Sequence, residues 1–397
     1  METSSCAGGG IALVAAVSPL AVSRERKQAD FGCARVLVVT HDFDLLLVGA
    51  GHAHLGVLRQ WMEHAPPPGR IGLISEGEYA WYSGMLPGLL AGRYRPNQCR
   101  VPLSLLCQAC GVELIQGRAV DLDSSAQRLM LGDGRFFTGA WLSLNLGSRP
   151  KPMRTADCGM HLLPVKPFEA FLDTWNQWRE RPQPLAILGG GAAGVELALA
   201  LAAQVPALTL ISAAPLLAGH PQALRERALR HLARAGVQVQ EGVAVDCVHF
   251  DSLKAGAQIV WRGQRVILAT GASPLTWLGG VGLACDEQGF IQVGRTLQCR
   301  AHPRIFAAGD CASLANTPRN GVYAVRQGPT LAANLFAALT NQPLRTFEPQ
   351  REALALLADG QGGALLSWAG LTAEGTWCGK WKDYLDRRFI RRHLAHP

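Results

Sequence analysis

The sequence predicts an α/β protein built from two Rossmann-like, three-layer dinucleotide-binding domains. Two glycine turns carry this prediction, because Gly49-Ala50-Gly51 and Gly189-Gly190-Gly191 each follow an apolar run and precede a helical pattern. A second apolar run follows each predicted helix, at residues 71–75 and 208–211. Strand, glycine turn, helix and strand in this order are typical of the βαβ unit, in which a pyrophosphate rests on the helix N-terminus.

The composition limits the class of protein. A chain of 397 residues, of which 48% are hydrophobic, is long enough for two or three domains. The formal net charge of +8 suits anionic cofactors or an anionic membrane surface, and no nucleic-acid-reading motif accompanies it, so we expect no nucleic-acid partner. The 11 cysteines form no regular framework, and no run of about 18 apolar residues occurs. We therefore expect reduced thiols, no spanning helix and a cytoplasmic location.

Residues 1–43 are interpreted as an extension outside the fold. The stretch 11–22 is apolar but lacks the basic n-region of a secretory signal. We therefore favour a disordered extension, or a translation start placed too early, over a targeting segment.

Apolar periodicity and turn residues predict the remaining elements in order. In the first half we expect helices at 52–64 and 104–110, strands at 44–48, 71–75, 112–116 and 141–146, and a meander over 120–139. In the second half we expect helices at 192–204, 221–235 and 321–339 and strands at 185–188, 208–211, 237–240, 266–270 and 305–308. Residues 341–397 are predicted to form a small α+β segment that ends in a basic helix.

The first glycine turn departs from the full G-x-G-x-x-G pattern. Gly49 is expected to make the tight turn and Gly51 to let the backbone approach a pyrophosphate, but His54 replaces the third glycine. Helix and strand therefore cannot pack as closely there. His52 and His54 are candidates for phosphate contacts, with packing against the sheet as an equal alternative. Glu76, after the second strand, is the candidate that binds a ribose hydroxyl, and its alternative is a solvated loop carboxylate.

The second glycine turn is complete, with Gly189, Gly191 and Gly194 at the required spacing. Its second strand ends at Ser212 without an acid, which weakens NAD recognition through a ribose-binding carboxylate. Arg225 is distant for binding the 2′-phosphate of NADP. The choice between NADH and NADPH therefore stays open.

Three further motifs resemble those of the pyridine nucleotide–disulphide oxidoreductase superfamily, the two-dinucleotide-binding flavoproteins. They are residues 146–150 (LGSRP), 269–272 (ATGA) and 305–312 (IFAAGDCA). The resemblance implies that FAD binds the first unit, with Asp310 on the ribityl chain and the backbone of Val120 near the adenine. It also implies that the turns at Gly147, Gly271 and Gly309 belong to the cofactor sites.

Within this superfamily the chain resembles the type II NADH dehydrogenase-like branch, and most of all the oxidoreductase module found fused to selenide, water dikinase. Four stretches carry the resemblance: 49–54 (GAGHAH), 82–88 (YSGMLPG), 321–328 (GVYAVRQG) and 382–389 (KDYLDRRF). It implies an FAD-binding domain in two parts, an NAD(P)-binding domain inserted between them and a C-terminal segment. The corresponding ranges are 44–165 and 272–340 for FAD, 166–271 for NAD(P) and 341–397 for the C-terminal segment.

The resemblance also implies the chemistry. The nicotinamide coenzyme gives hydride to FAD, and the reduced flavin passes electrons to an acceptor. Glu196, two residues after the third glycine of the second turn, is implied to lie near the nicotinamide as the catalytic residue. Its alternative is a carboxylate that the helix dipole stabilises. Quinones are the candidate acceptors, although Gly321-Val322 stand where type II dehydrogenases carry Ala-Gln.

The cysteines supply an alternative function. Residues 82–92 lack the C-x-x-x-x-C pair of disulphide reductases, and Cys107 and Cys110 are interpreted as core residues, because a second C-x-x-C for zinc is missing. Cys158 and Cys378 would serve a sulfide:quinone-type oxidoreductase. A flavoprotein without catalysis, acting as a redox-sensing or partner-binding module, is a further alternative.

The C-terminal segment places Trp381, Leu385 and Phe389 at helical spacing among basic residues: Lys380, Lys382, Arg387, Arg388, Arg391 and Arg392. A basic amphipathic helix of this kind can lie on an anionic membrane, here its inner face. It can equally pack on its own domain or on a second subunit of a homodimer.

Overall fold

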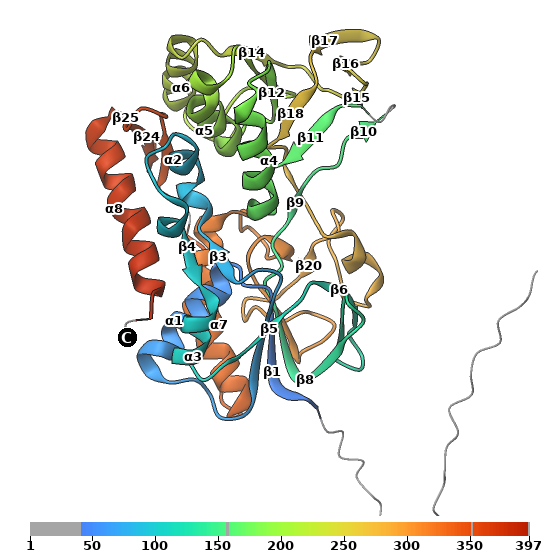
Figure 1. Cartoon of the computed structure of the whole chain (residues 1–397). Helices are drawn as coiled ribbons and strands as arrows, with labels where there is room; N and C mark the ends of the chain where they lie inside the picture. Colours follow the sequence, from blue (N-terminus) through green and yellow to red (C-terminus); the bar gives the residue numbers. More distant parts are fainter. Residues whose placement is uncertain (1–40, 156–158, 351, 396–397) are drawn as a thin grey trace, which may run out of the picture. The chain divides into compact units, whose positions relative to one another are not determined.

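The structure, a computed structural model, describes residues 41–155, 159–350 and 352–395. Cys158 and most of the predicted extension 1–43 lie outside the described residues, so their interpretation stays a prediction. Within the described residues, parallel sheets and helices alternate along the chain, which confirms the α/β fold class (Figure 1).

A seven-stranded sheet carries the first glycine turn. Its order is β5-β2-β1-β8-β7-β6, and β21 pairs with β8 as well. The neighbours β5, β2, β1, β8 and β21 are parallel, whereas β6, β7 and the start of β8 form the predicted antiparallel meander. Parallel strands are covered on both faces, which is why β1 and β2 are apolar runs. The strands are β1 (Phe43–Val48), β2 (Ile71–Ser75), β5 (Glu113–Gln116), β6 (Ala119–Asp123), β7 (Arg128–Leu131), β8 (Phe136–Leu144) and β21 (Ile305–Ala307).

Two helices of this unit, α1 (His52–His64) and α7 (Gly321–Leu339), pack closely against each other. They cross at Gly56 and Gly328, since a Cβ on Gly56 would lie 3.0 Å from the Cα of Gly328. This crossing joins segments at opposite ends of the chain. It places the first turn of α7 beside the glycine turn that opens α1.

A second sheet, all parallel, carries the second glycine turn and has the order β11-β18-β12-β13-β14. Its elements are β11 (His161–Pro164), α4 (Phe168–Glu180), β12 (Leu185–Leu188), α5 (Ala192–Leu201), η3 (Ala202–Gln204), β13 (Leu208–Ser212), α6 (Gln222–Arg234), β14 (Gln238–Glu241) and β18 (Arg265–Leu268). A smaller sheet of the order β10-β15-β16-β17 flanks it, with β10 (Arg154–Thr155), β15 (Cys247–Val248), β16 (Ser252–Ala255) and β17 (Gln258–Arg262).

The two connections between these sheets pair with each other. Strand β9 (Arg149–Pro150) runs antiparallel to β19 (Ala272–Ser273). The chain therefore enters the second unit near residue 150 and leaves it near 271. The predicted boundary between residues 165 and 166 comes too late, because β11 already pairs with β18 of the second sheet. Sequence pattern missed this, since β11 lies at the edge of its sheet and is short.

The C-terminal segment forms a three-stranded antiparallel sheet and a long helix. These are β23 (Ala355–Ala358), β24 (Ala364–Trp368), β25 (Leu371–Gly375) and α8 (Thr376–His393). Helix α8 packs on this sheet and on α1, so the predicted basic helix does lie against its own unit (Figure 1). Among the described residues, no helix combines the length and the apolar character that crossing a membrane requires.

Short elements complete the fold around the first unit. They are β3 (Tyr79–Trp81), η1 (Ser83–Met85), α2 (Leu86–Leu90), η2 (Pro96–Gln98), β4 (Arg100–Pro102), α3 (Leu103–Ala109), η4 (Thr276–Gly280), β20 (Ile291–Gln292), η5 (Gly309–Cys311) and β22 (Ala312–Ser313).

Candidate functional site

A cavity of about 510 Å³ opens at the carboxyl ends of β1, β2 and β8. Residues 166–169, at the start of α4, and 275–277, at the start of η4, form other parts of its wall. The carboxyl edge of a parallel sheet is where α/β proteins bind their ligands. The structure gathers seven of the predicted cofactor residues around this cavity: Gly49, Gly51, His52, Glu76, Val120, Gly147 and Asp310.

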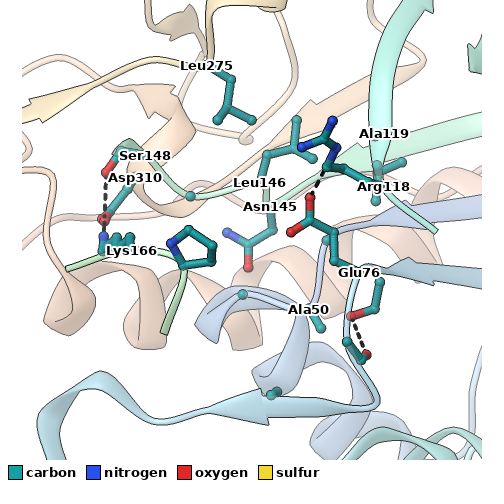
Figure 2. A pocket seen from close by; sticks show the side chains of 18 of the residues that line it. Ala50, Glu76, Arg118, Ala119, Asn145, Leu146, Ser148, Lys166, Leu275 and Asp310 are labelled. Carbon is teal, nitrogen blue, oxygen red and sulfur yellow. Dashed lines mark hydrogen bonds and ion pairs between the residues drawn. The ribbon is translucent and has the colours of Figure 1, made fainter. Parts of the chain in front are cut away.

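Asn145, a residue that the sequence analysis missed, lies at the centre of the cavity (Figure 2). Its side-chain Oδ1 accepts hydrogen bonds from the backbone N–H groups of Ala53 (3.1 Å) and His54 (3.2 Å), in the first turn of α1. Its Nδ2 donates to the carbonyl of Ala308 (2.7 Å) at the end of β21. One buried side chain thus joins the first turn of α1 to the ends of β8 and β21. Its position next to Leu146-Gly147 was the only sequence signal.

Three glycines make room for Asn145. A Cβ on Gly51 would lie 2.4 Å from Oδ1 of Asn145, and one on Gly309 would lie 2.5 Å from its Nδ2. A Cβ on Gly49 would lie 2.6 Å from its carbonyl oxygen. These glycines were predicted from cofactor approach, and the structure adds a contact within the protein. Gly309 supports the turn from behind and does not line the cavity, whereas Asp310 does.

Asp310 forms one end of the cavity. Its Oδ2 accepts hydrogen bonds from Lys166 Nζ (2.8 Å) and from Ser148 Oγ (3.3 Å). Its Oδ1 is buried and has no hydrogen-bond partner among the described residues. Burial alone would raise the pKa of Asp310, but the charge of the Lys166 ammonium and the hydrogen bonds from Lys166 and Ser148 together lower that pKa. The carboxylate is therefore ionised at neutral pH, with one buried oxygen that has no partner among the described residues.

Glu76 forms the opposite end of the cavity in Figure 2, beside Arg118. The carboxylate lies 3.8 Å from Arg118 Nε, and both side chains are more than half exposed. Ser75 is turned away from a ligand role, because its hydroxyl donates to the carbonyl of Gly77. Val120 lies in the same part of the lining, next to Arg118. Polar groups thus stand at both ends of the cavity.

The two histidines of the first turn have different positions. His52 lines the cavity, and its buried Nε2 has no partner among the described residues. His54 lies beneath the turn and not in the cavity. Its Nδ1 donates to the Gly49 carbonyl (2.6 Å), so its Nε2 accepts from Ser143 Oγ (2.8 Å). Burial lowers the pKa of each to about 4, so both rings are neutral at pH 7. For His54 the structure favours packing over phosphate contact.

The second glycine turn has the geometry of a complete motif. A Cβ on Gly194 would lie 1.8 Å from the carbonyl oxygen of Gly189, so the helix approaches the strand as closely as the sequence predicted. Gly191 and Gly271 face open space, since a Cβ on either would have no atom within 4 Å. Open space beside the turn that begins a helix leaves room for a pyrophosphate.

A carboxylate does stand near the end of β13, although not on that strand. Glu241 on β14 is the register partner of Ser212. Its carboxylate accepts hydrogen bonds from Arg225 and from the backbone N–H of Leu216. Arg225 is thus held close by, and Ser212 donates to the carbonyl of Ala214. These contacts place a carboxylate and an arginine near the end of β13 and favour neither NADH nor NADPH.

Glu196 is the fifth residue of α5 and points toward the C-terminal segment. Its Oε1 accepts a hydrogen bond from the backbone N–H of Ala358 (2.7 Å) and lies 4.0 Å from Lys382 Nζ. Burial raises the pKa of Glu196, opposed by the charge of Lys382. Glu196 does not line the cavity described above. Its implied role beside the nicotinamide stays a prediction.

Six of the eight described cysteines are buried, and Cys247 and Cys285 are partly buried. Cys107 and Cys110 belong to the core of the first unit, where burial raises their thiol pKa values to about 12 and about 11. Cys378 is fully buried between α8 and the C-terminal sheet. Burial also raises its pKa. A neutral, packed thiol is a poor nucleophile, so nothing at Cys378 favours the sulfide chemistry considered above.

Residues 43–328 match the family described as pyridine nucleotide-disulphide oxidoreductase. The chain belongs to this family. Among relatives of this oxidoreductase, demethylphylloquinone reductase NdbB of Synechocystis sp. is 25% identical over 345 residues, which are 79% of this chain and 83% of that protein. Type II NADH:quinone oxidoreductase of Haemophilus influenzae is 29% identical over 217 residues, 48% of this chain and 46% of that protein.

Among solved structures, the sulfide:quinone oxidoreductase of Aquifex aeolicus superposes with a TM-score of 0.71 at 18% identity, over 89% of this chain and 92% of that one. This similarity shows a shared fold. The curated relatives are matched over 41% to 83% of their own lengths.

The family assignment confirms the predicted superfamily and its type II NADH dehydrogenase-like branch. It also confirms the prediction of an oxidoreductase whose cofactors are FAD and a nicotinamide nucleotide. The narrower resemblance to the module fused to selenide, water dikinase stays a prediction, as do the individual roles of the site residues.

Proposed function

We propose that this oxidoreductase binds FAD in the cavity between Asp310 and Glu76, takes hydride from NADH or NADPH bound at the second glycine turn, and reduces a quinone. The observation that carries the proposal is the cavity itself. It stands at the carboxyl edge of the first sheet, beside the N-terminus of α1, and has polar groups at its two ends.

The residues present fit FAD. The buried Asp310 Oδ1 and His52 Nε2 have no partners among the described residues, and both belong to the lining of the cavity. A polyol such as the ribityl chain would supply hydroxyls to the Asp310 carboxylate. At the opposite end, Glu76 and Arg118 would hold the adenosine. Buried polar atoms are rarely left unpaired, so two such atoms on residues that line one cavity favour a polar ligand.

Charge also suits an anionic cofactor. Gly321 and Ala324, in the first turn of the 19-residue helix α7, line the cavity. The positive end of that helix dipole and the Lys166 ammonium favour negative charge on a bound group. When bound, FAD would supply the ring that accepts hydride from the nicotinamide and returns it, with one proton from solvent, to convert a quinone into a quinol.

A quinone is the acceptor that the relatives favour. The cyanobacterial relative is named a demethylphylloquinone reductase, and the one from Haemophilus influenzae is named an NADH:quinone oxidoreductase. The departure at Gly321-Val322 leaves the shape of the acceptor open. We therefore propose that the acceptor is a quinone, without assigning an individual one.

The test uses purified protein loaded with FAD. We expect NADH or NADPH to bleach the flavin absorbance without oxygen, and a water-soluble short-chain quinone to restore it. A protein that takes up no FAD would overturn the proposal at its first step. If sulfide bleached the flavin absorbance and neither coenzyme did, the result would favour a sulfide:quinone oxidoreductase instead.

The second nucleotide site yields a prediction with an internal control. Gly191→Ala adds a methyl group that meets no protein atom within 4 Å, so we expect the melting temperature without coenzyme to stay unchanged. The same methyl would meet the pyrophosphate of the coenzyme, and we expect its dissociation constant to rise about 100-fold. Gly194→Ala, which would clash with the Gly189 carbonyl, should lower the melting temperature as well. A coenzyme affinity unaffected by Gly191→Ala would place the nucleotide elsewhere.

We also propose peripheral contact with the membrane in which a quinone dissolves. Helix α8 exposes Trp377 and Tyr384, and the neighbouring β24–β25 turn exposes Trp368 and Leu371. The same helix exposes five basic residues: Lys380, Arg387, Arg388, Arg391 and Arg392. Aromatic and basic side chains together are typical of surfaces that lie on anionic lipid.

The expected result is binding to vesicles that contain phosphatidylserine, lost at high salt. Arg388→Gln with Arg391→Gln should weaken this binding at least about tenfold, because each basic residue near an anionic surface contributes about 1 kcal/mol. Flotation assays measure it. Arg154→Gln with Arg179→Gln, two exposed arginines of the second unit, is the control and should bind like the unaltered protein. Equal loss in both double variants would argue for a general charge effect.

A further inference from the structure

Residues 82–85, between β3 and α2, form part of the cavity through Ser83. The carbonyl of Gly84 in this segment accepts a hydrogen bond from Lys382 Nζ on α8 (2.8 Å). The two residues are 298 positions apart in the sequence. In the described part of the chain, the cavity lining includes no residue of α8 itself. Helix α8 therefore contacts the segment from behind.

An aromatic stack forms a second contact between α8 and this segment. The rings of Tyr82 and Phe389 lie parallel, with centroids 4.1 Å apart and planes inclined by 17°. On one side the stack touches His52, the first residue of α1, with centroids 5.6 Å from Tyr82. On its other side His393 covers Phe389 at 4.2 Å. Movement of Phe389 would therefore reach Tyr82 and His52, which lines the cavity.

A buried group of charges forms the third contact. Lys382 Nζ lies 3.1 Å from Asp386 Oδ2 and 4.0 Å from Glu196 Oε1, and the three side chains are 13%, 5% and 15% exposed. The Asp386 carboxylate also accepts a hydrogen bond from the Tyr82 hydroxyl. Burial raises the pKa of Tyr82, and the charge of Asp386 and this hydrogen bond raise it further. Lys382 thus bridges the cavity segment and Glu196 on α5. A buried ammonium with three oxygen partners has little freedom to move.

We propose that α8 is a positioning element for the flavin: Lys382, Asp386 and Phe389 hold residues 82–85 at the cavity wall, so that FAD affinity and ring orientation depend on a helix that does not touch the cofactor. This inference rests on the proposed function, because it presumes that the cavity holds FAD. It assigns a role to the two stretches, 82–88 and 382–389, which the sequence analysis singled out and which the chemistry above does not use.

The helix offers a matched control. Asp383 and Arg387 form a second ion pair with the same i, i+4 spacing, at 2.9 Å. Asp383 also accepts a hydrogen bond from a tyrosine, Tyr94 (2.7 Å), as Asp386 does from Tyr82. Neither Asp383 nor Arg387 contacts residues 82–85 in any interaction found among the described residues. The two pairs therefore differ in their relation to the cavity, and the control pair is also more exposed, which the melting temperature takes into account.

The experiment compares two double variants of the FAD-loaded protein: Lys382→Met with Asp386→Asn, and Arg387→Met with Asp383→Asn. Changing both partners leaves no charge of the Lys382–Asp386 pair behind, and Glu196, which loses the neighbouring ammonium, keeps its hydrogen bond from Ala358. The readouts, all without coenzyme, are the FAD dissociation constant, the visible circular dichroism of the bound flavin and the melting temperature. We expect the first double variant to raise the FAD dissociation constant about tenfold or more and to change the flavin dichroism. We expect the second to leave both within twofold of the unaltered protein.

If the first double variant does not fold, Phe389→Leu, which removes only the stack, is compared with Phe336→Leu, a partly buried phenylalanine on α7. The same contrast in flavin dichroism supports the proposal. The proposal would be overturned if FAD affinity fell in both test and control variants, in each by an amount that follows the fall in melting temperature. In that case, bleaching of the unaltered protein by NAD(P)H would still support the proposed function. An unaltered protein that binds no FAD would overturn both.

Discussion

Asn145→Leu should abolish FAD binding and lower the free energy of unfolding by about 3–5 kcal/mol. Leucine has a similar size, but it cannot accept the hydrogen bonds from Ala53 and His54 or donate one to Ala308. These backbone groups lie in the buried floor of the cavity, where each unsatisfied polar group costs about 1–3 kcal/mol. The floor would then lose the connection between α1, β8 and β21.

Chemical denaturation measures the first effect, and titration with FAD measures the second. Asn334→Leu is the control, because Asn334 on α7 is also fully buried. It too makes three hydrogen bonds with backbone groups, those of Thr296 and Arg345. We expect a similar loss of stability there with FAD affinity retained at temperatures where the protein is folded. Equal loss of FAD affinity in both would mean that Asn145 has no special relation to the site.

Asp310→Ala should raise the dissociation constant for FAD at least about 100-fold while leaving a folded protein. A hydrogen bond to a charged group contributes about 1.5–3 kcal/mol, and 100-fold corresponds to about 2.7 kcal/mol. The buried Oδ1 has no partner of its own, so the whole interaction with a ribityl hydroxyl would be lost. Lys166 is 36% exposed and can be solvated once its partner is gone. The fold should therefore tolerate the change.

Asp286→Ala is the matched control for this prediction. Asp286 is likewise a partly buried carboxylate paired with a cation, Arg319, at 3.3 Å. It also accepts hydrogen bonds from the backbone of Gln288 and Phe290. It stands outside the cavity lining, so its removal should cost stability and spare FAD. FAD affinity retained in Asp310→Ala would refute the assignment of this cavity to the ribityl chain.

Local sequence pattern was sufficient for the secondary structure around both glycine turns. The predicted helices 52–64 and 321–339 and strands 71–75 and 185–188 have the observed bounds. The reason is that buried parallel strands are short apolar runs, and each is followed by glycines that a tight turn requires. The replacement of the third glycine by His54 was also informative. Its ring fills the wider gap between α1 and β8, whereas Gly194 lies against Gly189.

The error in the predicted domain boundary and the failure to predict Asn145 and Lys166 have one cause, which is that both depend on contacts between segments far apart in the sequence. Strand β11 gives no clear signal alone, because its assignment depends on pairing with β18, about 100 residues later in the chain. Lys166 belongs to the site because it binds Asp310, which lies 144 residues away in the sequence. No periodicity within a window of the sequence contains such information, since it describes local structure only.

What the sequence by itself determined is therefore the fold class, the two glycine turns and, through its motifs, the family and its cofactors. What only the tertiary structure decided is how distant residues meet at the cavity: Asn145 beneath the first turn, Lys166 on Asp310, and α8 behind residues 82–85. The physical reason is that backbone turns and buried strands are specified by neighbours in the chain. The directions of buried polar side chains are specified by whichever segments the completed fold brings within hydrogen-bonding distance.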